Sequence, residues 1–507
     1  MCNFCQNFKV RSSEVRAVLG NYFGTGLEVE GFLLGLRLPD LIFNVVAGGA
    51  LGSAFIPTFT EYVSRDDEAG GWRLFSAVVN LIFLLMLVLA GLAMIFARPL
   101  VSVFIDFSKP EAAELLTLTV QMTRIMLISV VIFGFSGVFM AALNAKQHFF
   151  APALAGAMYN LGIILGTVLF APNITGAAWG AVAGSLLHAL VQVPALMGND
   201  ARYRPIFQTG DGGVKQVLTL MGPRILGLSF SYLNPFITPI LARSLVSGAV
   251  PALDYANRIM LVPYSLLGQA VGVASFPTMA TLAAEGKLAE MRQILTGALR
   301  SILFLGLPMT VGVILLQRPI VTILLERGAF TPDDTTLVAT TLLFYALAIL
   351  PLAGLEVIAR AFYSLQDTWT PVIAAVVQIV MMIGLSLLFA YQLFPSFGLE
   401  PAGGIALGFS LSNWLEVGVL IWLLRRKIGR LGGNDLVDGA WRMGLAAAVM
   451  VPAAWLILSF MGQSSPWLLI PLVGAVGAGV YFGMSQILAI RELSRFTTLV
   501  AARLGRG

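Results

Sequence analysis

FGTGLEVEGFLLGLRLPDLIFNVVAGGALGSAFIP, residues 23–57, is the stretch that decides the fold, because it places charged side chains inside an otherwise apolar segment and then recurs. A similar stretch occurs later in the chain, LDYANRIMLVPYSLLGQAVGVASFP at residues 253–277. The prolines that end the two stretches, Pro57 and Pro277, are 220 residues apart. Two copies of a charged segment rich in glycine predict two halves that face each other.

The same offset recurs beyond these stretches, so the repeat extends through each half. The further pairs at 220 or 219 residues are Arg98 with Arg318, Pro99 with Pro319, Gln147 with Gln366, and Pro152 with Pro371.

Composition identifies the class of protein. The chain has 507 residues, of which 58% are hydrophobic and 11% are charged, and its mean hydropathy is +0.87. A soluble globule needs more polar surface than this. Apolar blocks of about 20 residues are long enough to cross a bilayer as helices. We predict an all-α polytopic membrane protein with 13 confident spans: 28–59, 75–105, 113–143, 150–171, 175–197, 215–246, 251–282, 289–324, 334–365, 369–394, 402–424, 438–462 and 466–490.

A fourteenth span is predicted before these, within residues 1–24, but charged residues make this first helix short or incomplete. Most loop cations fall on one side of the membrane in this layout, which predicts that both termini are cytoplasmic. The loop cations on the opposite side are Arg98, Lys109, Arg243, Arg318 and Arg327.

The repeat offset contains six spans, an even number, so both copies enter the membrane in the same direction. We therefore predict two parallel six-helix lobes, an N-terminal lobe at 1–214 and a C-terminal lobe at 215–430, with an appended helix pair and cytoplasmic tail at 431–507. Transporters built from repeats place the substrate site between the repeats.

Several classes of function lack support in the sequence. The net charge of +5 comes without a basic patch interleaved with aromatic residues, which argues against nucleic acid as a partner. Cys2 and Cys5 supply two ligands where a structural zinc site needs four. We find no nucleotide-binding loop, no metal-spaced cluster and no nucleophile motif, and predict neither an enzyme nor a protein with a cofactor or metal.

Charges inside spans are costly in lipid, so they are expected to face a protein interior or a wet cavity. The arginines Arg37, Arg224 and Arg258 give such a cavity a positive field suited to an anionic headgroup, because guanidinium forks match phosphate oxygens. The alternative is internal pairing, by Glu30 with Arg37 or by Asp254 with Arg258. Both interpretations remain open at this point.

Glycines and prolines near these charges predict close helix packing and helix bends. Packing alone also explains the glycines. The residues concerned are Pro39, Pro57, Pro263, Pro277, Gly48, Gly49 and Gly52.

A series of motifs in order and with matching spacing resembles the MurJ (MviN) family of lipid II flippases, within the superfamily of multidrug and polysaccharide exporters. The motifs are FGTG at 23, LRLPDLI at 36, AGGALGSAFIP at 47, TEY at 60, ALNA at 142, MGPRILG at 221, YANRIM at 255, LLERGAFT at 324 and FYSLQDTWTP at 362.

The resemblance implies fourteen helices and transport of the lipid-linked peptidoglycan precursor to the outer leaflet of the bacterial inner membrane by alternating access. It implies a cationic cavity that meets the pyrophosphate of a polyprenyl-linked glycan, with membrane lipids and cell-wall synthesis proteins as further partners. Arg258 matches the arginine of a YADR-like motif, in which Asn257 replaces the acid. Glu30 occupies the place of an acid, and Arg16 lies near a motif of the first helix.

The chain departs from the family pattern at Phe43 and Asn44, where many members have one or two arginines. The runner-up functions are export of another lipid-linked glycan or small molecule, and a membrane scaffold without transport. Coupling to the membrane potential is a further expectation, because one charge crossing it is worth ~2.3 kcal/mol per 100 mV. Coupling to a monovalent cation through Glu30 or Asp254 is the alternative.

Overall fold

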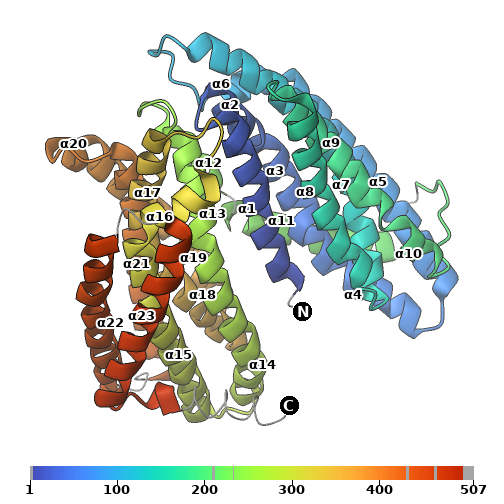
Figure 1. Ribbon diagram of the computed structural model, residues 1–507. Coiled ribbons are helices and arrows are strands. Elements are labelled where there is room, and N and C mark those ends of the chain that lie inside the picture. The colour runs from blue at the N-terminus through green and yellow to red at the C-terminus, as the bar shows by residue number, and fades with distance from the viewer. Residues whose placement is uncertain (1–3, 208–211, 232, 430–432, 462–464, 495–507) are drawn as a thin grey trace. The chain divides into compact units, whose positions relative to one another are not determined.

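The structure, a computed structural model, describes residues 4–207, 212–231, 233–429, 433–461 and 465–494. It consists of helices, and the chain divides into two compact units that are described separately below (Figure 1). Unit 1 is Met1–Pro251 with Gly328–Phe330, and unit 2 is Ala252–Arg327 with Thr331–Gly507. The two units are defined by which residues contact one another in the structure. The lobes at 1–214 and 215–430 are defined by the sequence repeat, and they remain a prediction.

Unit 1 begins with a helix where the sequence predicts its weakest span. Its helices are α1 Phe4–Phe23, α2 Leu27–Gly35, α3 Arg37–Phe43, the π-helix η1 Asn44–Leu51, α4 Gly52–Ser64, α5 Glu68–Ile95, α6 Ala97–Ser102, α7 Ala112–Ala145, α8 Phe150–Phe170, α9 Thr175–Leu190, α10 Val193–Met197, α11 Gly212–Ser231 and α12 Asn234–Ala242. Helix α11 packs on η1 and α4, which is why the contact-based unit extends past residue 214.

Unit 2 starts within α13. Its helices are α13 Ala249–Tyr264, the π-helix η2 Ser265–Gln269, α14 Ala270–Ala284, α15 Leu288–Leu315, α16 Gln317–Leu325, α17 Pro332–Ala346, α18 Ile349–Ser364, α19 Trp369–Leu388, the π-helix η3 Phe389–Leu393, α20 Phe394–Ser396, α21 Pro401–Ile428, α22 Gly433–Met461 and α23 Pro466–Ile487.

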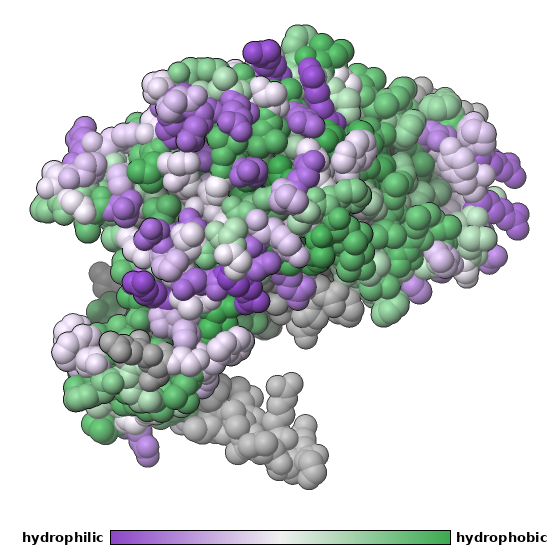
Figure 2. Space-filling view, turned by 45° about the horizontal axis from the view of Figure 1, so that its top comes forward, coloured by the Kyte–Doolittle hydropathy of each residue, from purple (hydrophilic) through white to green (hydrophobic). Residues whose placement is uncertain are grey.

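Among the described residues, ten helices are long and apolar enough to cross a membrane. Helices α17 and α18 form an eleventh span if the pair, bent by 41°, is counted as one. The chain is therefore a multi-pass membrane protein, and its surface carries broad hydrophobic areas beside patches of hydrophilic residues (Figure 2).

Two of the thirteen predicted spans are not among these ten helices and the bent pair. The span predicted at 28–59 is not one helix but the succession α2, α3, η1 and α4, and the span at 215–246 is divided into α11 and α12. The first carries four charged residues, and Pro39 and Pro57 lie within its helices. Proline lacks the N–H that continues a helix, so the apolar pattern overestimates the length of each helix here.

The sequence repeat is visible in the helix boundaries. Helices α5 and α15 both have 28 residues, and their first residues, Glu68 and Leu288, are 220 positions apart. Gln147 and Gln366, which are 219 positions apart, both have positive φ, at 60° and 59°. The matching turns place the following helices, α8 and α19, in matching order.

The appended helices α22 and α23 are anchored to unit 2. They pack on each other and against α15 and α16. The Tyr481 hydroxyl on α23 donates a hydrogen bond of 2.8 Å to the Phe304 carbonyl on α15. Buried polar groups need partners, so this bond fixes α23 against the lobe.

Candidate functional site

The predicted site residues fall into two groups, one in each unit. In unit 1, Glu30 on α2 is 8% exposed and accepts a hydrogen bond from the backbone N–H of Gly248. Lys109 is a further electrostatic partner of Glu30, and its ammonium group donates to the Leu245 carbonyl. Gly248 has a φ of +85°, and a Cβ there would lie 2.7 Å from Thr25 Oγ1, so glycine is required.

Tyr159 has one anion and one cation, Asp40 and Arg16, within electrostatic reach. Both act electrostatically on the Tyr159 hydroxyl on α8, and α1 packs along α8. Arg16 is partly exposed, and Asp40 is exposed. Arg37, the first residue of α3, is also partly exposed. The first three helices therefore contribute cations and anions to one part of unit 1.

Phe43 and Asn44, the two positions singled out in the sequence, have clear structural roles. The rings of Phe43 and Phe133 lie 4.8 Å apart, and Phe133 in turn contacts the rings of Tyr159 and His188. Asn44 Nδ2 donates a hydrogen bond of 2.7 Å to the Asp40 carbonyl. Phe43 thus extends an aromatic cluster within unit 1.

In unit 2, α13 carries Asp254, Asn257 and Arg258. Arg258 Nε lies 3.9 Å from Asp254 Oδ2, and the two side chains are 34% and 5% exposed. The predicted i, i+4 pair is therefore present, at the long limit for an ion pair. A third of the Arg258 side chain remains accessible. Asn257 is partly exposed on the same helix.

Both groups lie next to a π-helix. The η1 segment precedes α4, which contains Pro57, and η2 precedes α14, which contains Pro277. A π-helical turn and a proline both interrupt the regular hydrogen-bond ladder and provide a place for a bend. Sequence reasoning predicted bends at the prolines, with Pro39 inside α3 and Pro263 inside α13, but it missed the π-helices.

A polar cluster beside η2 was also missed in part. The Tyr264 hydroxyl donates to Glu356 Oε1 at 2.6 Å, and Arg360 Nη1 contacts Glu356 Oε2 at 2.5 Å. A Cβ on Gly272 would lie 2.5 Å from Arg360 Nη1, so this glycine makes room for the guanidinium. The i, i+4 spacing of Glu356 and Arg360 is typical of an ion pair on one helix face, but nothing local in the sequence indicated Tyr264 or Gly272.

The remaining predicted residues are only partly visible. The side-chain surroundings of Arg224, Gly48, Gly49 and Gly52 lie outside the described residues. The unit 1 group contains Arg16, Glu30 and Arg37, and the unit 2 group contains Asp254, Asn257 and Arg258. A shared cavity lined by both groups stays a prediction.

Comparisons with known proteins point to one family. The family model described as "Lipid II flippase MurJ" matches residues 19–473. A "probable lipid II flippase MurJ" of Buchnera aphidicola subsp. Acyrthosiphon pisum is 26% identical, over 94% of each chain. One of Rhizobium tropici is 30% identical, over 80% of this chain and 76% of its own. A solved structure, "Lipid II flippase MurJ, inward closed conformation", has a TM-score of 0.79 at 23% identity and covers 97% of this chain and 98% of its own.

Proposed function

Because the chain belongs to the family of MurJ lipid II flippases, we propose that it moves lipid II from the cytoplasmic to the outer leaflet of the bacterial inner membrane for cell-wall synthesis. The observation that carries the proposal is the family match over residues 19–473. The accessible Arg258 beside Asp254 supports it, because this arginine matches the family motif.

In the proposed mechanism the protein supplies a polar path and performs no covalent chemistry. Arg258, Arg37, Arg224 and Arg16 attract the pyrophosphate of the polyprenyl-linked glycan, because a guanidinium binds two phosphate oxygens at once. Glu30, Asp254 and Asn257 keep the empty site polar. Inward-open and outward-open states then alternate, and a ligand shifts their balance only through its different affinity for each state.

The energy source in this proposal is the membrane potential or a monovalent cation, with no bound cofactor. Moving one elementary charge through the membrane potential is worth ~2.3 kcal/mol per 100 mV, enough to bias two states of similar energy. Both termini are proposed to be cytoplasmic, in line with the distribution of loop cations. Membrane lipids and cell-wall synthesis proteins are the further proposed partners.

Growth of a bacterium depleted of its own lipid II flippase tests the function. We expect the wild-type chain to restore growth and Arg258→Ala to abolish this. Arg124→Ala is expected to leave growth intact, because Arg124 is exposed and its Nε donates to the Met94 carbonyl. Membrane levels of each variant are measured by immunoblot.

Two results would contradict the proposal, one by pointing to another substrate and the other by pointing to a protein without transport activity. Wild-type growth with Arg258→Ala or with Arg258→Glu excludes a cationic site at this position and favours export of another substrate. Failure of the wild-type chain to expose lipid II at the outer surface, when lipid II is labelled from outside in intact cells, favours a scaffold.

A further inference from the structure

Glu416 on α21 is a buried acidic side chain that the proposed mechanism does not use. It is 7% exposed, and it is the sixteenth of the 28 residues of this helix, which is long and apolar enough to cross the membrane. At 1.5 Å per residue, Glu416 is about 22 Å from the first residue of α21 and about 18 Å from the last. The hydrocarbon core is about 30 Å thick, so Glu416 lies near the middle of the span and not at either end.

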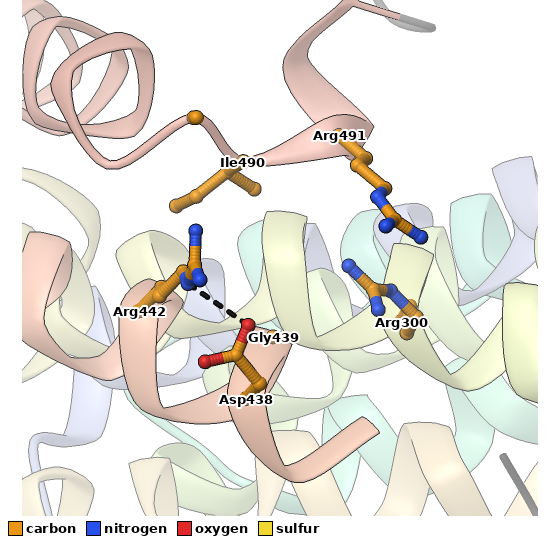
Figure 3. Close-up of a pocket in the computed structure, with 7 residues that line it drawn as sticks. Arg300, Asp438, Gly439, Arg442, Ile490 and Arg491 are labelled. Carbon is orange, nitrogen blue, oxygen red and sulfur yellow. Dashed lines mark ion pairs between the residues drawn. The ribbon is translucent and has the colours of Figure 1, made fainter. Parts of the chain in front are cut away.

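The carboxyl group of Glu416 has no polar partner within the part of the chain that the structure describes. It takes part in no hydrogen bond and in no ion pair there. Several acidic side chains elsewhere in unit 2 have a cation partner, even at the surface, where Asp438 Oδ2 lies 2.9 Å from Arg442 Nε (Figure 3). Further examples are the pairs Asp254–Arg258, Glu356–Arg360, Asp367–Lys427 and Glu492–Arg300.

The elements packed against α21 bring no cation into contact with Glu416, and all of them lie wholly within the described residues. These elements are α15, α17, α18, α19, η3 and α20. Helices α19 and α20 carry no titratable side chain, and on α21 itself the next charged residue is Arg425, nine positions further along. The charged or titratable residues of the other elements are Asp333, Asp334 and Tyr345 on α17, Glu356, Arg360 and Tyr363 on α18, Tyr391 on η3, and Glu290, Arg292 and Arg300 on α15.

The nearest polar groups along the buried face of α21 are uncharged. Gln378 on α19 is 3% exposed, and its Nε2 donates a hydrogen bond of 2.9 Å to Ser412 Oγ. Ser412 and Asn413 precede Glu416 by four and three residues, spacings that place the three side chains on one face of the helix. Asn413 Nδ2 donates to the Phe409 carbonyl at 2.8 Å, whereas its Oδ1 accepts no hydrogen bond from a described residue. A neutral carboxyl group can donate to such an amide oxygen, but a carboxylate cannot.

Burial, depth and the lack of a cation together favour the neutral form of Glu416. A carboxylate here would carry an uncompensated charge inside a membrane span, which is costly. A buried acidic group without a partner takes up a proton instead. Acidic side chains within membrane spans are rare, and they occur where protons or ions are bound and passed on.

We propose that Glu416 is a proton-binding site inside unit 2, held as the neutral acid by the contact between α21 and α19. Loss of this proton requires water to reach the carboxyl group, so protonation of Glu416 is linked to how closely these two helices pack. The proposal does not depend on the transported substrate, because protonation is measured without lipid II and without transport.

Infrared difference spectroscopy tests the protonation directly, because the C=O stretch of a carboxylic acid is separate from the stretches of a carboxylate. Purified full-length wild type and Glu416→Gln are compared in detergent at pH 7. We expect the wild type to show an acid band that Glu416→Gln lacks. Glu400→Gln, which removes an exposed carboxylate at the N-cap of the same helix, is the matched control. It is expected to lose carboxylate absorption and to keep the acid band.

Modification of the wild type with dicyclohexylcarbodiimide gives a second test that needs no variant to fold. A carboxyl oxygen adds to the central carbon of this apolar reagent and the acid proton moves to one of its nitrogens, so the neutral acid reacts. We expect mass spectrometry of the digested protein to find the adduct at Glu416. About tenfold less adduct, or lower, is expected at Glu400, because an exposed glutamate is almost wholly ionised at pH 7.

The proposal is overturned by a carboxylate signal for Glu416 in place of the acid band, by absence of the adduct at Glu416, or by equal adducts at Glu416 and Glu400. Where the two measurements differ, the infrared band decides, because it needs no access for a reagent. Failure of the chain to transport lipid II leaves both results unchanged.

Discussion

The Tyr264 hydroxyl donates a hydrogen bond of 2.6 Å to Glu356, and thereby ties the end of α13 to α18 where η2 begins. Tyr264 is the last residue of α13 and follows Pro263. Arg360 contacts the other carboxylate oxygen of Glu356 and occupies the space that a Cβ on Gly272 of α14 would need. Glu356 on α18 thus stabilises the helix before the π-helical break directly, through Tyr264, and the helix after it through Arg360.

Removal of this hydroxyl is predicted to loosen the break. Tyr264→Phe leaves one oxygen of a half-buried carboxylate without its donor, and hydrogen bonds to charged groups contribute about 1.5–3 kcal/mol. We expect a lower unfolding temperature in detergent. Tyr363→Phe, on the exposed side of α18, is the control and is expected to have no effect. Equal stability of the two variants would show that Tyr264 does not brace the bend.

Helices α8 and α9 are predicted to tolerate no side chain at their closest approach. A Cβ at Gly162 would lie 2.3 Å from the Gly184 Cα, which is backbone and cannot turn away. Gly162→Ala is therefore expected to separate the helices and to cost about 1–3 kcal/mol of stability. Gly384→Ala on α19 meets nothing within 4 Å and is expected to be neutral or slightly stabilising, because alanine favours the helix. Thermal unfolding of both variants distinguishes these outcomes.

The buried ion pair between Arg300 and Glu492 is predicted to matter more than a surface pair. Glu492→Gln removes the charge that compensates a guanidinium only 12% exposed, and the loss of one partner of a buried pair costs about 3–5 kcal/mol. Glu61→Gln breaks the ion pair of Glu61 with Arg65, whose side chains are 43% and 73% exposed. This substitution is expected to cost at most about 1 kcal/mol of stability. Similar unfolding temperatures for the two variants would contradict this ranking.

The pair of Asp367 and Lys427 is predicted to weaken in acid. Partial burial opposes the charged carboxylate, but hydrogen bonds from Lys427 and Thr370 outweigh it and lower the pKa of Asp367 from 3.8 to about 2. A lowered folded-state pKa gives stability that is present above pH ~4 and is lost as the pH falls toward 2. The difference in unfolding temperature between the wild type and Asp367→Asn is expected to shrink from pH 6 to pH 3. A constant difference would show that the charge of Asp367 contributes nothing.

Local patterns in the sequence account for much of the fold. Apolar blocks predicted membrane helices because hydropathy sums over neighbouring residues, and the repeat predicted matching helices such as α5 and α15. The Asp254–Arg258 pair followed from i, i+4 spacing, because one turn of helix places such residues on the same face. The motifs around Arg258 indicated the family to which the chain belongs.

The tertiary structure decided what depends on neighbours from distant parts of the chain. Arg300 pairs with Glu492, 192 residues away, a contact that no local pattern in the sequence indicates. The break at residues 44–51 replaced a continuous span, because the energy of a π-helical turn depends on the helices packed against it. The sequence alone thus determined which segments are helices and that they cross a membrane, since both properties depend on the summed contributions of neighbouring residues. Only the packed chain determined which charges meet, because an ion pair forms between whichever side chains the fold brings together.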